Sequence, residues 1–279
     1  MLEVYRKVTC VVLGLSLATL YGCGPSDDGA GADGGVDAAD ADTQSFSDSR
    51  PGTINAEVYA HSPTTLYRLN PNTLVVDTVA DFNGCGEVID IALDKDSNLY
   101  GTSFTGLYRI NRDTAVCTLI ATGSYPNSLS FVPAGVLDPT SEVLVAYLGS
   151  DYIRIDVTTG AITTIGTIGG GLSSSGDIVS VEGGGTYLTV EGPNCDDCLI
   201  QVNPADGGLQ RNWGELGFPD VWGLAYWGGV AYGFDDNGSA FSIEFGASTV
   251  TTTPIAFPGA PPGLRFWGAG STTVAPIID

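Results

Sequence analysis

Basic residues and histidine are scarce in this sequence. The 279-residue chain has 10 Lys and Arg against 32 Asp and Glu, a formal net charge of −22, and a single His. A field of this sign repels phosphate backbones and anionic headgroups, so we expect no nucleic-acid partner. We interpret the lone His61 as an incidental strand-end residue, because no G-x-S-x-G motif accompanies it to complete a Ser-His-Asp triad.

The sequence also lacks a membrane-spanning apolar run and any clear amphipathic helix. Its most apolar segment, "VTCVVLGLSLATL" at residues 8–20, follows two basic residues. It is shorter than the roughly 20 residues of a spanning helix and matches the apolar region of a signal peptide. This predicts an exported protein with a signal peptide at residues 1–22.

The end of that segment resembles the bacterial lipobox. "LYGC" places Cys23 where signal peptidase cuts before a diacylated Cys. The resemblance implies lipidation of Cys23 and anchoring in a bacterial cell envelope. We expect the outer membrane, because Gly24 follows the Cys instead of a retaining Asp. The alternative is an ordinary signal peptide with an incidental Cys.

A tether is expected next in the chain. Residues 24–52 are rich in Gly, Ala, Asp and Ser and contain almost nothing apolar, a composition typical of an extended, disordered linker. From Asn55 onward, apolar and Thr residues alternate between turn residues. We therefore predict a lipidated Cys with an acidic tether at 23–54 and one folded domain at 55–279.

The folded part repeats itself. Copies of an "LYRIN"-like strand occur at residues 66–70, 107–111, 152–156, 199–203 and 240–244, with central positions 41, 45, 47 and 41 residues apart. Between them lie pairs of apolar strands joined by tight turns, at residues 89–103, 127–149, 176–192 and 221–235. One unit is thus four short antiparallel strands in about 44 residues, which is typical of a propeller blade.

The two chain ends carry complementary parts of one unit. The folded part begins with a second-strand copy at 57–62 and ends with an inner-strand copy at 263–270. We predict an all-β, five-bladed β-propeller of four-stranded antiparallel blades, closed by three N-terminal strands and one C-terminal inner strand. An open β-sandwich also has many short strands, but it would not produce complementary ends.

The repeats resemble a known family of propellers. "DIALDKDSNLYGTS" at 90–103, followed by "LYRIN", is similar to the blade repeat of NHL and SMP-30-like β-propellers, over about residues 55–270. Because many unrelated propellers share these motifs, the resemblance implies an architecture but does not identify an activity. "DKDSN" also begins like an EF-hand loop, but without the Gly and Glu that complete one we interpret it as a turn.

The cysteines of the folded domain are even in number. Cys85, Cys117, Cys195 and Cys198 predict two disulfides in an exported chain. The blade alignment favours the pairs 195–198, across a hairpin loop, and 85–117, within one blade. A redox C-x-x-C and a four-Cys zinc site are the alternatives.

Polar residues stand where the inner strands begin. Aligned positions are Asp90, Ser128, Asp177, Gly223 and Gly263, with Asn127 and Trp222 beside two of them. Inner strands line a propeller's axis, so Asp90, Asn127, Ser128 and Asp177 are candidate ligands of a metal or another ligand at a channel mouth. The resemblance to SMP-30-like hydrolases implies a divalent metal there. The alternative is that the aspartates bond backbone amides.

Four tryptophans lie in the last third of the sequence, at positions 213, 222, 227 and 267. We expect them in the core, although a carbohydrate or peptide surface also uses such rings. The favoured function is a monomeric binding or scaffold module for a protein, carbohydrate or small molecule. The alternative is a lactonase or esterase that depends on one divalent cation such as Ca²⁺.

Overall fold

A computed structural model describes residues 57–278 of the chain. The predicted signal peptide at 1–22, the lipidation of Cys23 and the tether at 23–54 lie outside these residues. Among the described residues, no helix is long and apolar enough to cross a membrane.

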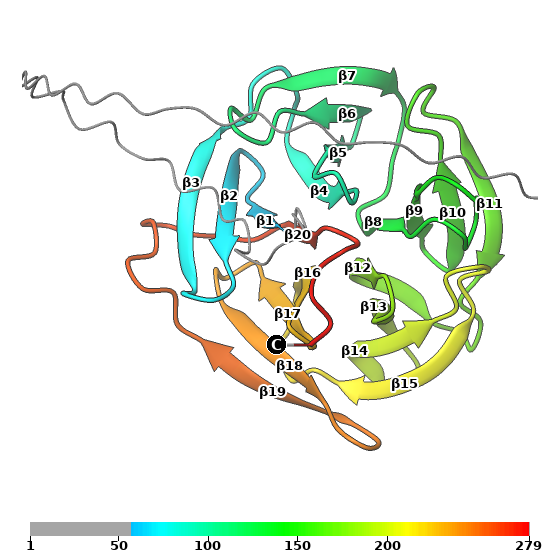
Figure 1. Cartoon of the computed structure of the whole chain (residues 1–279). Coiled ribbons are helices and arrows are strands. Elements are labelled where there is room, and N and C mark those ends of the chain that lie inside the picture. Colours follow the sequence, from blue (N-terminus) through cyan, green and yellow to red (C-terminus); the bar gives the residue numbers. More distant parts are fainter. Residues whose placement is uncertain (1–56, 279) are drawn as a thin grey trace, which may run out of the picture. The chain divides into compact units, whose positions relative to one another are not determined.

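The described chain forms a ring of five four-stranded antiparallel sheets, as predicted (Figure 1). From the axis outward, blade 1 contains β20 (Gly268–Ser271), β1 (Val58–His61), β2 (Thr65–Asn70) and β3 (Val75–Asp81). Blade 2 contains β4 (Val88–Leu93), β5 (Leu99–Ser103), β6 (Gly106–Ile110) and β7 (Cys117–Thr122). Blade 3 contains β8 (Leu129–Val132), β9 (Val143–Leu148), β10 (Asp151–Ile155) and β11 (Ile162–Thr167). Blade 4 contains β12 (Ser173–Val181), β13 (Gly185–Gly192), β14 (Cys195–Val202) and β15 (Leu209–Glu215). Blade 5 contains β16 (Val221–Trp227), β17 (Val230–Asp235), β18 (Ala240–Phe245) and β19 (Val250–Ile255).

The ring closes where the two ends of the fold pair. β1 pairs antiparallel with β20, with Val58 opposite Ser271 and His61 opposite Gly268. This confirms the closure by three N-terminal strands and one C-terminal inner strand. The prediction that this inner strand begins at Gly263 was wrong by five residues, because Gly263 has a positive φ of 71° and lies in the preceding loop.

Burial follows the distance from the axis. The inner strand β4 is buried at all six residues, whereas the outer strand β11 is exposed or half-buried throughout. A strand that is buried on both faces needs apolar residues in succession, which is why the inner strands read as short continuous runs. The core therefore lies between blades and around the axis.

Turn chemistry separates the third and fourth strands of the blades. The Asn70 side-chain oxygen accepts the backbone N–H groups of Asn72 and Thr73, and Asp156 accepts those of Thr158 and Thr159. Asn111 does the same in blade 2. Each of these side chains accepts the backbone N–H groups two and three residues on, so the repeated Asn or Asp fixes the turn after the "LYRIN"-like strand in blades 1, 2 and 3.

Both predicted disulfides are present. Cys85 pairs with Cys117 in blade 2 and Cys195 with Cys198 at the start of β14, with Cα–Cα distances of 5.5 and 5.6 Å. The core position predicted for the tryptophans holds for Trp213 and Trp227. Trp222 and Trp267 are only half-buried and pack edge to face at 5.9 Å between ring centroids.

The two faces of the ring differ. We name the face where the inner strands begin the start face and the face where they end the tail face. After β20 the chain crosses the tail face (Figure 1), where the Glu182 N–H donates to Thr273 O and the Gly228 N–H to Pro276 O. The Thr272 N–H donates to Glu57 O, so the described chain also begins on the tail face.

Candidate functional site

The structure brings together three of the four residues predicted at the channel mouth. Asp90 on β4, Ser128 just before β8 and Asp177 on β12 are all completely buried. Asp90 and Asp177 share a side-chain hydrogen bond, and Asp90 also bonds the Ser128 backbone. Asn127, in contrast, is exposed.

Backbone amides occupy the oxygens of both aspartates. Asp90 Oδ2 accepts the N–H groups of Ser128 and Leu129, both at 2.5 Å, and Oδ1 accepts that of Ile91 at 2.8 Å. Asp177 likewise accepts the N–H groups of Ile178 at 2.6 Å and Leu224 at 2.7 Å. Each aspartate therefore ties its own inner strand to that of the next blade.

In this geometry the two aspartates bond backbone amides, which was the alternative to a metal site. A cation at this point would replace charge-assisted hydrogen bonds in a fully buried place. Metal or ligand binding by Asp90, Asn127, Ser128 and Asp177 stays a prediction, and the structure adds no observation in its favour.

The paired aspartates cannot both be ionised at low cost. Burial raises the pKa of Asp90 to about 7, and the amide hydrogen bonds oppose this rise. Burial, and then the adjacent Asp90 charge, raise the pKa of Asp177 well above its ordinary value. Two buried carboxyl groups in contact therefore hold a shared proton at neutral pH.

His61 is a third buried polar group beside the pair. Its Nδ1 lies 2.9 Å from Ser62 O, which makes Nδ1 the protonated nitrogen, and Nε2 is buried without a hydrogen-bond partner. A Cβ on Gly268 would lie 2.5 Å from both His61 Nε2 and Asp90 Oδ1. The absence of a side chain at Gly268 thus leaves the space that the imidazole and the carboxyl group fill. Burial lowers the pKa of His61 to about 4.

The interpretation of His61 as an incidental residue therefore missed its burial. The signal in the sequence was its alignment with Thr102, whose hydroxyl donates at 3.0 Å to Pro126 O from a fully buried position. Polar groups at this strand position point inward.

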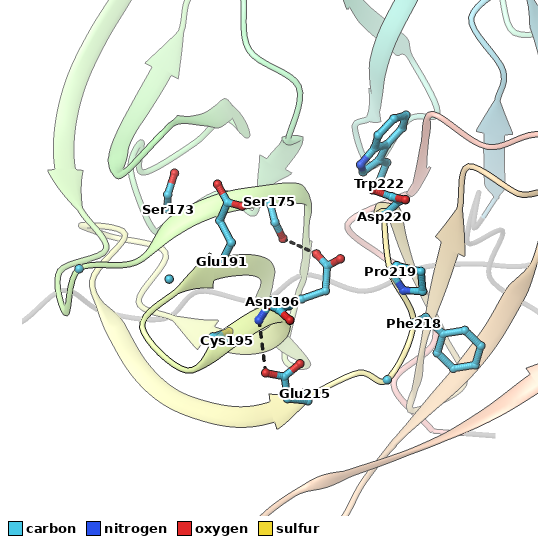
Figure 2. A pocket seen from close by; sticks show the side chains of 14 residues that line it. Ser173, Ser175, Glu191, Cys195, Asp196, Glu215, Phe218, Pro219, Asp220 and Trp222 are labelled. Atoms are coloured by element: carbon cyan, nitrogen blue, oxygen red, sulfur yellow. Dashed lines mark hydrogen bonds between the residues drawn. The ribbon is translucent and has the colours of Figure 1, made fainter.

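A pocket opens on the start face between blades 4 and 5 (Figure 2). It has a volume of about 970 Å³. Five of its lining residues are acidic, namely Glu191, Asp196, Asp197, Glu215 and Asp220, and none is Lys, Arg or His. Ser173, Ser175, Phe218 and Trp222 complete its polar and aromatic lining.

Neighbouring groups hold two of the pocket carboxylates in place. The Ser175 hydroxyl donates to Asp197 at 2.7 Å, and burial raises the pKa of Asp197. The Asp196 N–H donates to Glu215 Oε1 at 3.3 Å (Figure 2). Asp196 and Asp197 also lie between the two cysteines of a disulfide, which holds them in place. The pocket is thus acidic, and hydrogen bonds and a disulfide hold part of its acidic wall in place.

The aromatic residues are held at the other wall. Phe218 stacks on Phe241 at 3.9 Å between centroids, and Trp222 packs against Trp267. Sequence reasoning missed this pocket because its walls come from segments far apart in the chain, at 171–175, 191–197 and 215–222. No local motif marks such a convergence.

Comparisons with known proteins concern the fold alone. No known family model matches the sequence, and no curated protein matches it. A chain in the crystal structure of a nidogen/laminin complex is similar over 77% of this chain and 98% of its own, with 14% identity and a TM-score of 0.48. A protein of unknown function from Bacteroides caccae has the same coverages, 11% identity and a TM-score of 0.43. An oligogalacturonate lyase in complex with manganese covers 71% of this chain and 61% of its own, with 12% identity and a TM-score of 0.38.

Proposed function

We propose that this propeller is a lipid-anchored binding module of the bacterial envelope, and that its ligand carries amine or guanidinium groups. The observation that carries the proposal is the pocket of about 970 Å³, with five acidic lining residues and no basic one. Pockets of this size accommodate small molecules or short chain segments. The function needs no chemical step by the protein.

Charge selects the class of ligand. Glu191, Asp196, Glu215 and Asp220 are exposed around the pocket, so their field reaches solvent and attracts cations. Phe218 and Trp222 also line the pocket, and aromatic rings attract cations directly. An organic cation is attracted by the charge of the carboxylates and by the rings, whereas a neutral sugar gains hydrogen bonds and ring contacts but no charge attraction.

The location of the pocket fits display from a membrane. The described chain begins on the tail face, and the pocket lies on the opposite, start face. An attachment that reaches the ring through residue 57 would therefore leave the pocket face uncovered.

Isothermal titration calorimetry with a linear polyamine tests this proposal. We expect binding by the chain with Cys23→Ser that weakens as salt rises, because exposed charges are screened. Glu191→Gln and Asp220→Asn should each reduce affinity about two- to fivefold, the effect of one exposed charge pair.

Glu244→Gln is the matched control, because Glu244 is exposed on β18 and does not line the pocket. It should bind as the parent chain does. Binding of a neutral oligosaccharide with no binding of the polyamine would contradict the proposal.

A further inference from the structure

Three potential metal ligands meet at the wall of the pocket. The Sγ atoms of Cys195 and Cys198 and a carboxylate oxygen of Glu215 all lie within 4.8 Å of one another. Cys198 and Glu215 are direct partners across the β14–β15 pair. The register of the sheet therefore assembles this group, and its geometry does not depend on a mobile loop.

Glu215 is already oriented for ligation. Its Oε1 accepts the Asp196 N–H, and Asp196 lies between the two cysteines. A backbone amide that holds one oxygen of a carboxylate leaves the second oxygen to a metal, which is a common support for ligating carboxylates.

The oxidation state of the sulfurs decides whether the group can bind. In the disulfide, Cys195 and Cys198 have no thiolate to offer. A dithiol that supplies two electrons and two protons converts the disulfide into two thiols and is itself oxidised to a disulfide. A divalent metal then displaces both protons, and two thiolates with one carboxylate remain as ligands.

The chemistry of the donors selects the metal. A C-x-x-C pair is typical of zinc sites, where Zn–S is about 2.3 Å and Zn–O about 2.0–2.2 Å, so neighbouring donors lie roughly 3.5–4 Å apart. Donors already within 4.8 Å reach that arrangement by small side-chain rotations. The surrounding Asp196, Asp197 and Glu191 favour a cation, and the open pocket supplies water as a fourth ligand.

We propose that Cys195, Cys198 and Glu215 form a redox-gated site for a thiophilic divalent cation of the Zn²⁺ class. The disulfide closes the site, and reduction by an external dithiol opens it. This site shares Glu215 with the pocket proposed above, but it is tested through the two sulfurs, which the organic cation does not use.

Titration with Co²⁺ tests the site, because thiolate ligation gives strong near-ultraviolet charge-transfer absorption. The protein is the full chain with Cys10→Ser and Cys23→Ser, which leaves four cysteines. After anaerobic reduction with a phosphine, we expect one Co²⁺ per chain with this absorption, displaced by Zn²⁺. The oxidised chain should show no such band. Cys198→Ser should abolish the band, and Glu215→Gln should keep it with at least tenfold weaker binding.

Alkylation mapping locates the metal in the same reduced chain. Compared with the reduced, metal-free chain, Zn²⁺ should slow the alkylation of Cys195 and Cys198 and leave the rates at Cys85 and Cys117 unchanged. Protection of Cys85 and Cys117 instead would overturn the proposal. So would equal Co²⁺ binding by the oxidised chain, absence of the band after reduction, or loss of the far-ultraviolet β signal on reduction.

Discussion

Asp177→Asn and His61→Gln, which replace the two titratable groups beside Asp90, should have opposite effects on the pH dependence of stability. Asp90 has its pKa raised from 3.8 to about 7. From about pH 4 to 7 the folded state therefore keeps a proton that the unfolded state releases, and the free energy of unfolding falls by about 1.4 kcal/mol per pH unit. The pKa of Asp177 is also raised, so its contribution has the same sign.

His61 acts in the opposite direction. Its pKa is lowered from 6.5 to about 4, so between these values the unfolded state binds a proton that the folded state excludes. Stability from His61 thus rises with pH by about 1.4 kcal/mol per unit. The falling contributions of Asp90 and Asp177 and the rising contribution of His61 therefore partly cancel between pH 4 and 6.5.

Urea unfolding at pH 4.5, 5.5 and 6.5 measures these slopes. Asp177→Asn keeps a hydrogen-bond donor to Asp90 but removes one titration, so the parent should lose stability relative to this variant as the pH rises. Relative to His61→Gln, the parent should gain about 1.4 kcal/mol per pH unit. The control is Thr102→Val, a buried position that does not titrate, whose effect should not vary with pH. Slopes of equal sign for the Asp177 and His61 variants would refute the proposed protonation states.

Three further outcomes are expected. Gly268→Ala should lower the free energy of unfolding by about 1–3 kcal/mol in thermal or urea unfolding, because its Cβ would lie 2.5 Å from His61 and Asp90. The control is Gly86→Ala, because a Cβ at Gly86 would have no atom within 4 Å. Equal effects of the two substitutions would contradict the packing described. Cys85→Ser should lower the melting temperature more than Cys198→Ser, because the separations are 32 and 3 residues and the corresponding stabilisations are roughly 4 and 2 kcal/mol; the reverse order would show that ring size does not dominate. Cells grown on a labelled fatty acid should label the parent chain and not Cys23→Ser, and an unlabelled, released parent would contradict lipid anchoring.

Much of the fold was predictable because every blade has a similar and recognisable sequence pattern. Alternating or continuous apolar strands and repeated Asn or Asp turns at residues such as Asn70 and Asn111 mark the four strands of a unit. The complementary ends then predict closure. The start of the last inner strand was misplaced, because β20 is short and rich in Gly, so neither side-chain pattern nor propensity marks where it begins.

The candidate site was less predictable for a physical reason. Alignment correctly brought Asp90, Ser128 and Asp177 together, since inner strands converge on the axis. The partners of the two carboxylates are backbone amides of the next blade, and such partners have no signature in residue type. The burial of His61 depends on Gly268, which has no side chain and lies opposite His61 in the sheet although it is near the other end of the sequence. The pocket likewise exists only after three distant segments meet.

The pairing of β1 with β20 has a consequence for how the protein is made. The chain is synthesised from its N-terminus, so the inner edge of β1 has no partner until residues 268–271 are available. An unpaired strand edge invites association with other chains, and pairings so distant in sequence form slowly. Pairing of β20 with β1 is therefore the final step of assembly. Loss of the segment from residue 268 onward would leave an open ring with an exposed edge on β1.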